Sequence, residues 1–301
     1  MICLKLDIDT RRGLDQGLPP LLSLLKDEGV AASVYFTMGP DESGKAVRRV
    51  FTRKGFLKKM LRTNAAKMYG WRTMLYGTLL PAPPVGEARP DLLKRTADEG
   101  HEIGLHAWSH VQWQDCLDSM SGAQIDLELD LAFDAWRKAL GQGAAPAGFA
   151  APAWKVNDTA LRCLFKRPFS YISVTRGAEP VILRAGEDAA PFPELPTTLP
   201  TLDEILAWDG MTLDKAFDFL AQAPVEGRLN VYTLHTEAEG LALFGFFRRL
   251  LRRWKGDGHA FLRLDAAAAG LNRMLPNVSS ARNGTLAGRG GAVSASCGCG
   301  F

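Results

Sequence analysis

ICLKLDIDT, residues 2–10, alternates apolar and polar side chains as far as Ile8 and then ends in a short acidic motif. Such alternation is typical of a β-strand. Residues two apart in a strand point to the same face, so we expect Asp7 and Asp9 side by side at the carboxyl end of this strand. Two neighbouring carboxylates repel each other unless a cation lies near them. The alternative is that Asp9 caps the following helix, a role that does not suit Asp7.

Short apolar runs alternate with helical patterns from this strand up to about residue 265. Six further strands are predicted, at residues 31–38, 102–105, 147–151, 171–175, 230–234 and 260–264. Repeated β-then-α units imply parallel strands with helical crossovers, and therefore an α/β fold. In both barrels and open sheets of this class, functional sites lie at the carboxyl ends of the strands.

Two segments interrupt this pattern. Residues 39–87 are too long for an ordinary connection between a strand and a helix, and their own periodicity is helical. Residues 269–301 are rich in Gly, Ser and Ala, and we predict that they are disordered. The predicted domain therefore spans residues 1–268, with residues 39–87 as a basic, amphipathic helical insert.

The net charge of +3 conceals an uneven distribution of charge. Residues 43–86 hold ten basic and no acidic residues, and residues 241–255 hold five basic and no acidic ones. The rest of the chain is strongly acidic. No apolar run approaches the roughly 18 residues that span a bilayer, and no signal peptide is visible. Five scattered cysteines, an odd number, do not indicate a disulfide framework, so we expect a reducing cytoplasm.

Two of the five histidines occur in the segment His106-Ala-Trp-Ser-His110. A spacing of four predicts that both imidazoles lie on one side of a single helical turn, where both can reach one ion. The pair follows the predicted strand at 102–105, so it belongs to the carboxyl end of that strand. The alternative is two unrelated histidines, one that caps a helix and one on the surface.

The predicted strand at residues 230–234 leads directly into His235, in the motif Val231-Tyr-Thr-Leu-His235. A single histidine at a strand end is usually structural. Three strands that end in Asp-x-Asp, His-x3-His and His would, however, converge at one edge of the fold, as a metal-dependent hydrolase requires. The sequence contains no G-x-S-x-G elbow, Walker loop or dinucleotide-binding motif.

These motifs resemble the polysaccharide deacetylase (NodB-homology) superfamily. The resemblance rests on Asp7-Ile-Asp-Thr10, Glu102-Ile-Gly-Leu-His-Ala-Trp-Ser-His110 and Leu234-His235. Further segments resemble one group within it, the deformylases of undecaprenyl-phosphate-linked 4-deoxy-4-formamido-L-arabinose. These segments are Gly39-Pro-Asp41 and residues 59–71, 104–108, 199–204 and 231–240. The resemblance covers roughly residues 1–264 and implies a distorted, seven-stranded (β/α) barrel with a helical insert after the second strand.

The resemblance also implies residue roles. Asp7 would be the general base and His235 the general acid, while Asp9, His106 and His110 would bind one divalent ion. Two imidazoles and a carboxylate suit Zn, Co, Mn, Ni or Fe equally. The superfamily's Arg-x-Pro segment reads Ala150-Ala-Pro152 here, so its arginine is missing. Candidates for that charge and for substrate contact are Arg176, Lys155, Trp154 and Glu237.

The insert places Lys58, Lys59 and Arg62 among apolar residues, a pattern that suits an anionic membrane surface. Residues 243–254 have the same character. The alternative for each is a helix whose apolar face packs on the core. We therefore expect an enzyme on the inner face of the inner membrane of a Gram-negative bacterium, in contact with anionic lipid and without a protein partner.

The expected substrate is the lipid-linked formamido sugar of lipid A modification, a route to resistance against cationic peptides. One alternative is an N-deacetylase of another polysaccharide or lipid-linked amino sugar. A second is an inactive barrel that binds anionic lipid or nucleic acid. The acidic body of the chain argues against nucleic acid, because it would repel phosphates.

Overall fold

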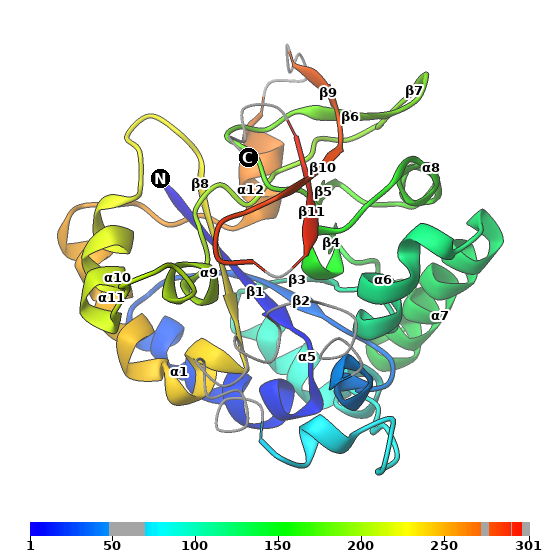
Figure 1. The fold of residues 1–301 in the computed structure, drawn as a ribbon, viewed down its shortest axis with the longest axis horizontal. Helices are drawn as coiled ribbons and strands as arrows, with labels where there is room; N and C mark the ends of the chain where they lie inside the picture. Colours follow the sequence, from blue (N-terminus) through cyan, green and yellow to red (C-terminus); the bar gives the residue numbers. More distant parts are fainter. Residues whose placement is uncertain (48–69, 272–276, 290, 297–301) are drawn as a thin grey trace.

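The computed structural model describes residues 1–47, 70–271, 277–289 and 291–296. Its centre is a sheet of six parallel strands in the order β5-β4-β3-β2-β1-β8 (Figure 1). The strands are β1 (Ile2–Ile8), β2 (Ser33–Phe36), β3 (Glu102–Leu105), β4 (Gly148–Ala150), β5 (Tyr171–Ser173) and β8 (Asn230–His235). Six of the seven predicted strands are therefore present.

Residues 193–199 connect the two outer strands of this sheet. Along β5, the Leu195 N–H donates to the Ile172 carbonyl (2.8 Å), and on β8 the Leu199 N–H donates to the Val231 carbonyl (3.0 Å). The segment contains Pro193 and Pro196, which have no N–H to donate, so it forms isolated bridges rather than a strand. The predicted distorted α/β barrel is confirmed, with six strands instead of seven.

The predicted strand at 260–264 is wrong. Phe261 forms one isolated bridge with Ile2, and helix α12 (Leu264–Gly270) begins at the last residue of the predicted range. The run of alanines from 266 to 269 favours a helix over a strand, which explains the difference.

The alternation in β1 separates two interior regions. Even-numbered side chains such as Leu4 and Leu6 pack in the main apolar core against the helices. Odd-numbered side chains point into the barrel, where Cys3 joins a second, smaller apolar cluster at one end. Lys5 and Asp7 follow it toward the carboxyl end and are 0% and 3% exposed. The inside of the barrel is therefore polar near the carboxyl ends of its strands.

Helices surround the sheet (Figure 1). They are α1 (Leu18–Asp27), α5 (Pro90–Asp98), α6 (His110–Cys116), α7 (Gly122–Leu140), α8 (Asp158–Phe165), α9 (Leu202–Leu206), α10 (Leu213–Gln222), α11 (Phe244–Gly256) and α12. Helix α11 is the second basic segment of the sequence. It buries Phe247, Leu250 and Trp254, and Arg252 forms an ion pair with Glu28 (2.7 Å). Helix α11 therefore packs its apolar face on the core, which is the alternative to membrane contact that the sequence left open.

The C-terminal segment is ordered where the structure describes it, so the predicted disorder is wrong there. It forms β9 (Val278–Ser280), β10 (Arg282–Thr285) and β11 (Ala292–Ala295). Strand β10 pairs with β11, and β9 pairs with β6 (Ile182–Ala185), which also pairs with β7 (Asp188–Ala189). The available edge of β6 explains the order, because it supplies backbone partners that composition does not reveal. Helix α12 runs across the predicted boundary at residue 268.

The ends of the insert are anchored beside the first strand. A bridge between Pro40 and Pro84 joins its two ends. The Arg11 N–H, just after β1, donates to Asp41 Oδ2 (2.9 Å). Both described ends, residues 39–47 and 70–87, therefore lie at the carboxyl end of β1. Lys58, Lys59 and Arg62 lie outside the described residues.

Within the described residues, no helix has the length and apolar character that a membrane crossing needs.

Two π-helical turns, Gly13–Gly17 and Ala238–Ala242, pack against each other through glycines beside the carboxyl end of the barrel. A Cβ on Gly17 would lie 2.1 Å from the Thr236 carbonyl oxygen, although its φ of −88° suits any residue. We expect Gly17→Ala to lower the free energy of unfolding by about 1–3 kcal/mol, because backbone must move to admit the methyl group. Urea unfolding measures this effect.

Gly245→Ala is the matched control for this prediction. Gly245 is exposed in α11, and a Cβ there would meet nothing within 4 Å. The same substitution should raise stability by up to about 1 kcal/mol, the difference in helix propensity. Equal effects of the two substitutions would contradict the close approach at Gly17.

Candidate active site

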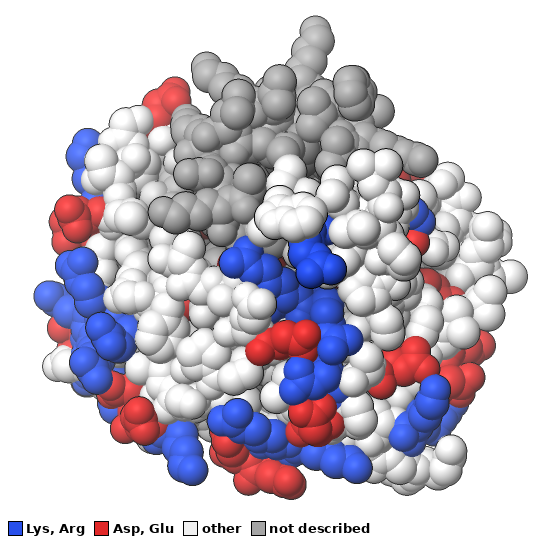
Figure 2. All heavy atoms as spheres, turned by 90° about the horizontal axis from the view of Figure 1, so that it is seen from below, with Lys and Arg blue, Asp and Glu red and all other residues white. Residues whose placement is uncertain are grey.

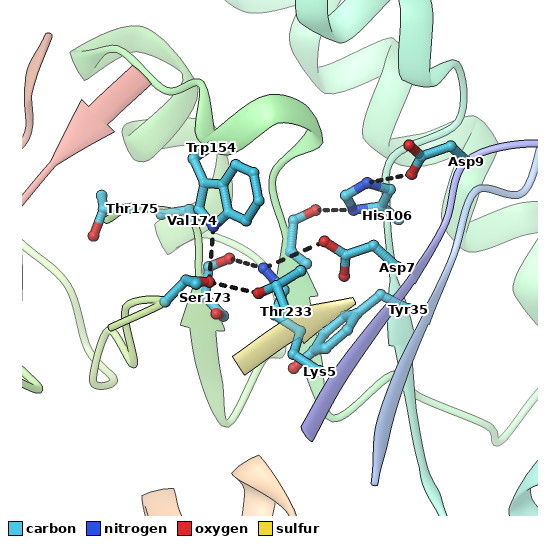
Figure 3. A network of polar contacts seen from close by, with 12 residues as sticks. Lys5, Asp7, Asp9, Tyr35, His106, Trp154, Ser173, Val174, Thr175 and Thr233 are labelled. Carbon is cyan, nitrogen blue, oxygen red and sulfur yellow. Dashed lines mark hydrogen bonds and ion pairs between the residues drawn. The ribbon is translucent and has the colours of Figure 1, made fainter. Parts of the chain in front are cut away.

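Asp9, His106 and His110 converge at the carboxyl end of the barrel. Asp9 follows β1, His106 follows β3, and His110 is the first residue of α6. The Nε2 atoms of His106 and His110 lie 3.3 and 3.4 Å from the two carboxylate oxygens of Asp9. One potential ligand atom from each residue lies within 4.8 Å of the others. The structure thus brings together the three residues that the sequence proposes as ligands (Figure 3 shows Asp9 and His106).

The two histidines do not share a helical turn, so that part of the prediction is wrong. His106 ends an extended segment, Ala107 has a φ of 65°, and α6 starts only at His110. The segment after β2 runs beside this turn, where the Gly39 N–H donates to the Trp108 carbonyl (2.9 Å). A Cβ on Gly39 would lie 2.4 Å from the Trp108 ring. The motif Gly39-Pro-Asp41 therefore allows the histidine turn to lie against β2.

Hydrogen bonds orient the first histidine and the aspartate. His106 Nδ1 lies 2.9 Å from the Ala150 carbonyl oxygen at the end of β4. A proton on Nδ1 would make this contact a hydrogen bond and leave the Nε2 lone pair directed at Asp9. Glu237 accepts hydrogen bonds from the Asp9 N–H (3.1 Å) and the Thr10 N–H (2.8 Å). Glu237 therefore holds the turn that carries Asp9.

The carboxyl groups near this turn differ in their ionisation. Burial raises the pKa of Glu237, and the charge of Asp9 raises it further. Burial also acts to raise the pKa of Asp9, but the charge of His110 and the neighbouring imidazole of His106 outweigh it, so this pKa is lowered. Asp9 is therefore a carboxylate. Its Oδ1 atom is buried and has no hydrogen-bond partner among the described residues.

These residues fit a divalent transition-metal ion. They offer one carboxylate oxygen and two imidazole nitrogens, a set that leaves positions open for water and substrate. The buried Oδ1 of Asp9, without a hydrogen-bond donor, is the atom that a cation would satisfy. The donor set does not distinguish among Zn, Co, Mn, Ni and Fe.

Asp7 and His235 lie next to this triad on paired strands. They are register partners of β1 and β8. Asp7 is inside the barrel, and its Oδ1 atom is buried without a hydrogen-bond partner among the described residues. The His235 N–H donates to Glu239 Oε2 (3.1 Å). Burial acts to lower the pKa of His235, but the charges of Asp9, Asp203 and Asp7 outweigh it and raise this pKa to about 9.

Trp154 lies beside His235. The two rings meet edge to face, with centroids 6.2 Å apart, and the Trp154 Nε1–H donates to Thr197 Oγ1 (2.8 Å). Ala153 and Trp154 both have positive φ, at 56° and 50°. Consecutive non-glycine residues in this region of backbone space are strained, and such strain concentrates at functional sites. The turn thus directs the indole toward the general-acid candidate.

The two candidates for the missing arginine charge have other partners. Lys155 Nζ lies 2.7 Å from Asp118 Oδ2, which directs its charge toward the loop after α6. Arg176 forms an ion pair with Glu204 (3.2 Å) and lies over the Trp154 ring. The cation that contacts Asp7 is Lys5, 3.6 Å from its Oδ2. The sequence contained a signal for Lys5, a lysine on the same face of the first strand as Asp7, but no prediction used it.

Comparison with known proteins defines the class. The model of the polysaccharide deacetylase family matches residues 4–172. A solved structure described as a polysaccharide deacetylase from Mycobacterium smegmatis superposes with a TM-score of 0.60 at 16% identity, over 89% of each chain, and so shares the fold. The chain belongs to the polysaccharide deacetylase family, whose fold is the NodB-type barrel found here, and it is a hydrolase of amide C–N bonds.

Two curated relatives indicate the group within this family to which the chain is similar. Both are named 4-deoxy-4-formamido-L-arabinose-phosphoundecaprenol deformylase ArnD. The protein of Shewanella sediminis is 35% identical over 86% of this chain and 83% of its own length. That of Wigglesworthia glossinidia brevipalpis is 32% identical over 84% and 87%. Within its family, the chain therefore groups with the ArnD deformylases.

Proposed function

We propose that the protein is a metal-dependent deformylase. Its substrate would be undecaprenyl-phosphate-linked 4-deoxy-4-formamido-L-arabinose, and its products formate and the free amino sugar on its lipid carrier. The observation that supports this most directly is the convergence of Asp9, His106 and His110 beside Asp7 and His235, in a chain 35% identical to a protein of that name. The product would serve lipid A modification and resistance to cationic peptides.

In this proposal, Asp9, His106 and His110 hold one divalent ion. Such an ion would polarise the formamide carbonyl and lower the pKa of water. Asp7 would accept the proton of the attacking water, because one of its oxygens is buried near the triad without a hydrogen-bond donor. A C–O bond then forms at the formyl carbon.

His235 would complete the reaction as the general acid. The surrounding carboxylates favour its protonated form, which can donate to the departing amine nitrogen as the C–N bond breaks. A positively charged imidazole can also stabilise negative charge on the carbonyl oxygen. Trp154, edge to face with His235, would limit the motion of the imidazole.

The surface near the insert supports contact with a lipid-linked substrate. Figure 2 shows Lys and Arg side chains in the middle and along the rim of the face at the lower edge of Figure 1, with Asp and Glu side chains interspersed among them. Trp71 and Leu79, which are 67% and 80% exposed, belong to the described end of the insert. Cations beside exposed apolar side chains suit an anionic lipid head group and its hydrocarbon chain. We propose peripheral contact with the inner face of the inner membrane.

The proposed function predicts a specific change in mass of the lipid-linked substrate. Incubation with the protein should remove one formyl group and release formate, and a chelator should stop the reaction until a divalent ion is restored. The N-acetylated analogue, offered at the same concentration, should react far more slowly. Mass spectrometry of the lipid before and after incubation measures all three outcomes. Faster reaction of the acetylated lipid would replace the proposal by an N-deacetylase.

A further inference from the structure

Lys5 is a lysine inside the barrel. It lies in the middle of β1, between Leu4 and Leu6, and is 0% exposed. Burial of an ammonium group is costly unless the charge is paired and hydrogen-bonded. The cost appears in its pKa, which burial lowers and the charge of Asp7 partly restores. An apolar side chain would fill this position at lower cost, so the lysine requires a reason.

Several elements hold the amine of Lys5 in one place. Its Nζ donates a hydrogen bond to the Ser173 carbonyl oxygen of β5, across the barrel (3.1 Å). It also lies over two aromatic rings, 5.6 Å from the centroid of Tyr35 and 5.4 Å from that of Trp154. Figure 3 shows the amine between these groups, directed at Asp7. The Lys5 side chain is therefore fixed by contacts on three sides.

The contact with Asp7 distinguishes the two oxygens of this carboxylate. Oδ2 lies 3.6 Å from Lys5 Nζ, and the two side chains are 0% and 4% exposed. Oδ1 is buried as well, but it has no hydrogen-bond partner among the described residues. One oxygen is thus held by a cation, while the other is left for a proton.

The other carboxyl group near Lys5, that of Glu194, has hydrogen-bond donors of its own. Glu194 is buried and accepts hydrogen bonds from the N–H groups of Val174 (3.0 Å) and Thr175 (2.8 Å). Burial raises the pKa of Glu194 to about 7, although the hydrogen bonds from Thr175 and Val174 and the charge of Lys5 act to lower it. Glu194 therefore shapes the backbone after β5, and the ion pair of Lys5 within 4.0 Å is with Asp7.

We propose that Lys5 is the positioning residue of the general base: it holds Oδ2 of Asp7 so that Oδ1 faces the reacting water. The inference rests on the proposed role of Asp7. It assigns to β1 both the base and the group that orients it, since Lys5 and Asp7 are neighbours on the inner face of one strand. The ammonium also balances a carboxylate that would otherwise lie close to Asp9 without compensation.

A double-mutant cycle with Lys5→Met and Asp7→Asn tests the proposal. Lys5→Met keeps the length of the side chain and removes the charge. We expect kcat for formate release to fall about 100-fold, the size of a small misplacement of a catalytic group, with KM and metal content unchanged. In the Asp7→Asn background, Lys5→Met should cause no further loss of kcat, because the group on which it acts is gone.

Unfolding supplies a second readout that does not depend on turnover. Each single variant should unfold at lower urea concentration, and the double variant should lose less than the sum, because it leaves no unpaired buried charge. Lys26→Met, on the exposed face of α1, is the matched control. It should leave kcat unchanged, and its effect on unfolding should simply add to that of Asp7→Asn.

Wild-type kcat in Lys5→Met, or equal losses from Lys5→Met with and without Asp7, would overturn the proposal. A wild-type protein that turns over no amide would refute the proposed function instead. In that case additive unfolding effects would show that Lys5 does not hold Asp7, and coupled effects would support the pairing.

Discussion

Replacement of His106 or His110 by Ala should abolish metal retention and reduce formate release by at least about 1000-fold. Each variant removes one of the three proposed ligand side chains, and without the ion the amide carbonyl would no longer be polarised. His106→Ala should also free the Ala150 carbonyl, whose contact orients the ring. Metal analysis of the purified variants and an assay of formate release measure the two effects.

His259→Ala is the control for these variants. His259 lies in the turn after α11, far along the chain from the three proposed ligands, and has no part in the proposed chemistry. Its replacement should leave metal content and turnover at wild-type values. A His106 or His110 variant that binds no metal yet releases formate at the wild-type rate would contradict the metal-dependent mechanism.

Asp7→Asn should reduce kcat by about 100- to 10,000-fold, the range for loss of a general base, and leave the metal in place. The amide has the shape of the carboxylate but cannot accept a proton from water. The structure supports different roles for the two aspartates, because the cluster of potential ligand atoms contains Asp9 and not Asp7. Formate release and metal content, measured on the same preparation, test it.

Asp9→Asn gives the comparison. Asp9 is two residues away and carries the same functional group, but its oxygens face His106 and His110. We therefore expect Asp9→Asn to lose both metal and activity. If Asp7→Asn lost metal as Asp9→Asn does, Asp7 would be a ligand, and the assignment of the base would be wrong.

The candidate site was predictable because its residues stand next to strand ends. Alternation in β1 placed Asp7 and Asp9 at a carboxyl end, and the same argument applied to His106 and His235. Parallel strands bring their carboxyl ends to one edge, so residues from three segments far apart in the chain could be grouped into one site without coordinates. The local conformation between His106 and His110 was not predictable, since spacing alone does not reveal the positive φ of Ala107.

The C-terminal segment shows a different limit of prediction. Its Gly, Ser and Ala residues carry too little apolar surface to predict a fold. The Arg176 N–H nevertheless donates to the Ser294 carbonyl (2.9 Å), and the Ser296 N–H donates to the Arg176 carbonyl (2.8 Å). Small side chains allow this close approach: a Cβ on Gly177 would lie 2.2 Å from Ser296 Oγ. Backbone pairing with a distant edge orders the segment.

The sequence by itself determined the class of fold, the five residues of the candidate site and their likeness to the polysaccharide deacetylases. These follow from periodicity and from motifs at strand ends, which are local properties of the chain. The tertiary structure decided which of the candidate cations contacts Asp7, because the directions of Lys155 and Arg176 depend on how the segments after β4 and β5 fold. Lys5, in the first strand, is the cation that contacts Asp7, whereas Lys155 and Arg176 form ion pairs with Asp118 and Glu204.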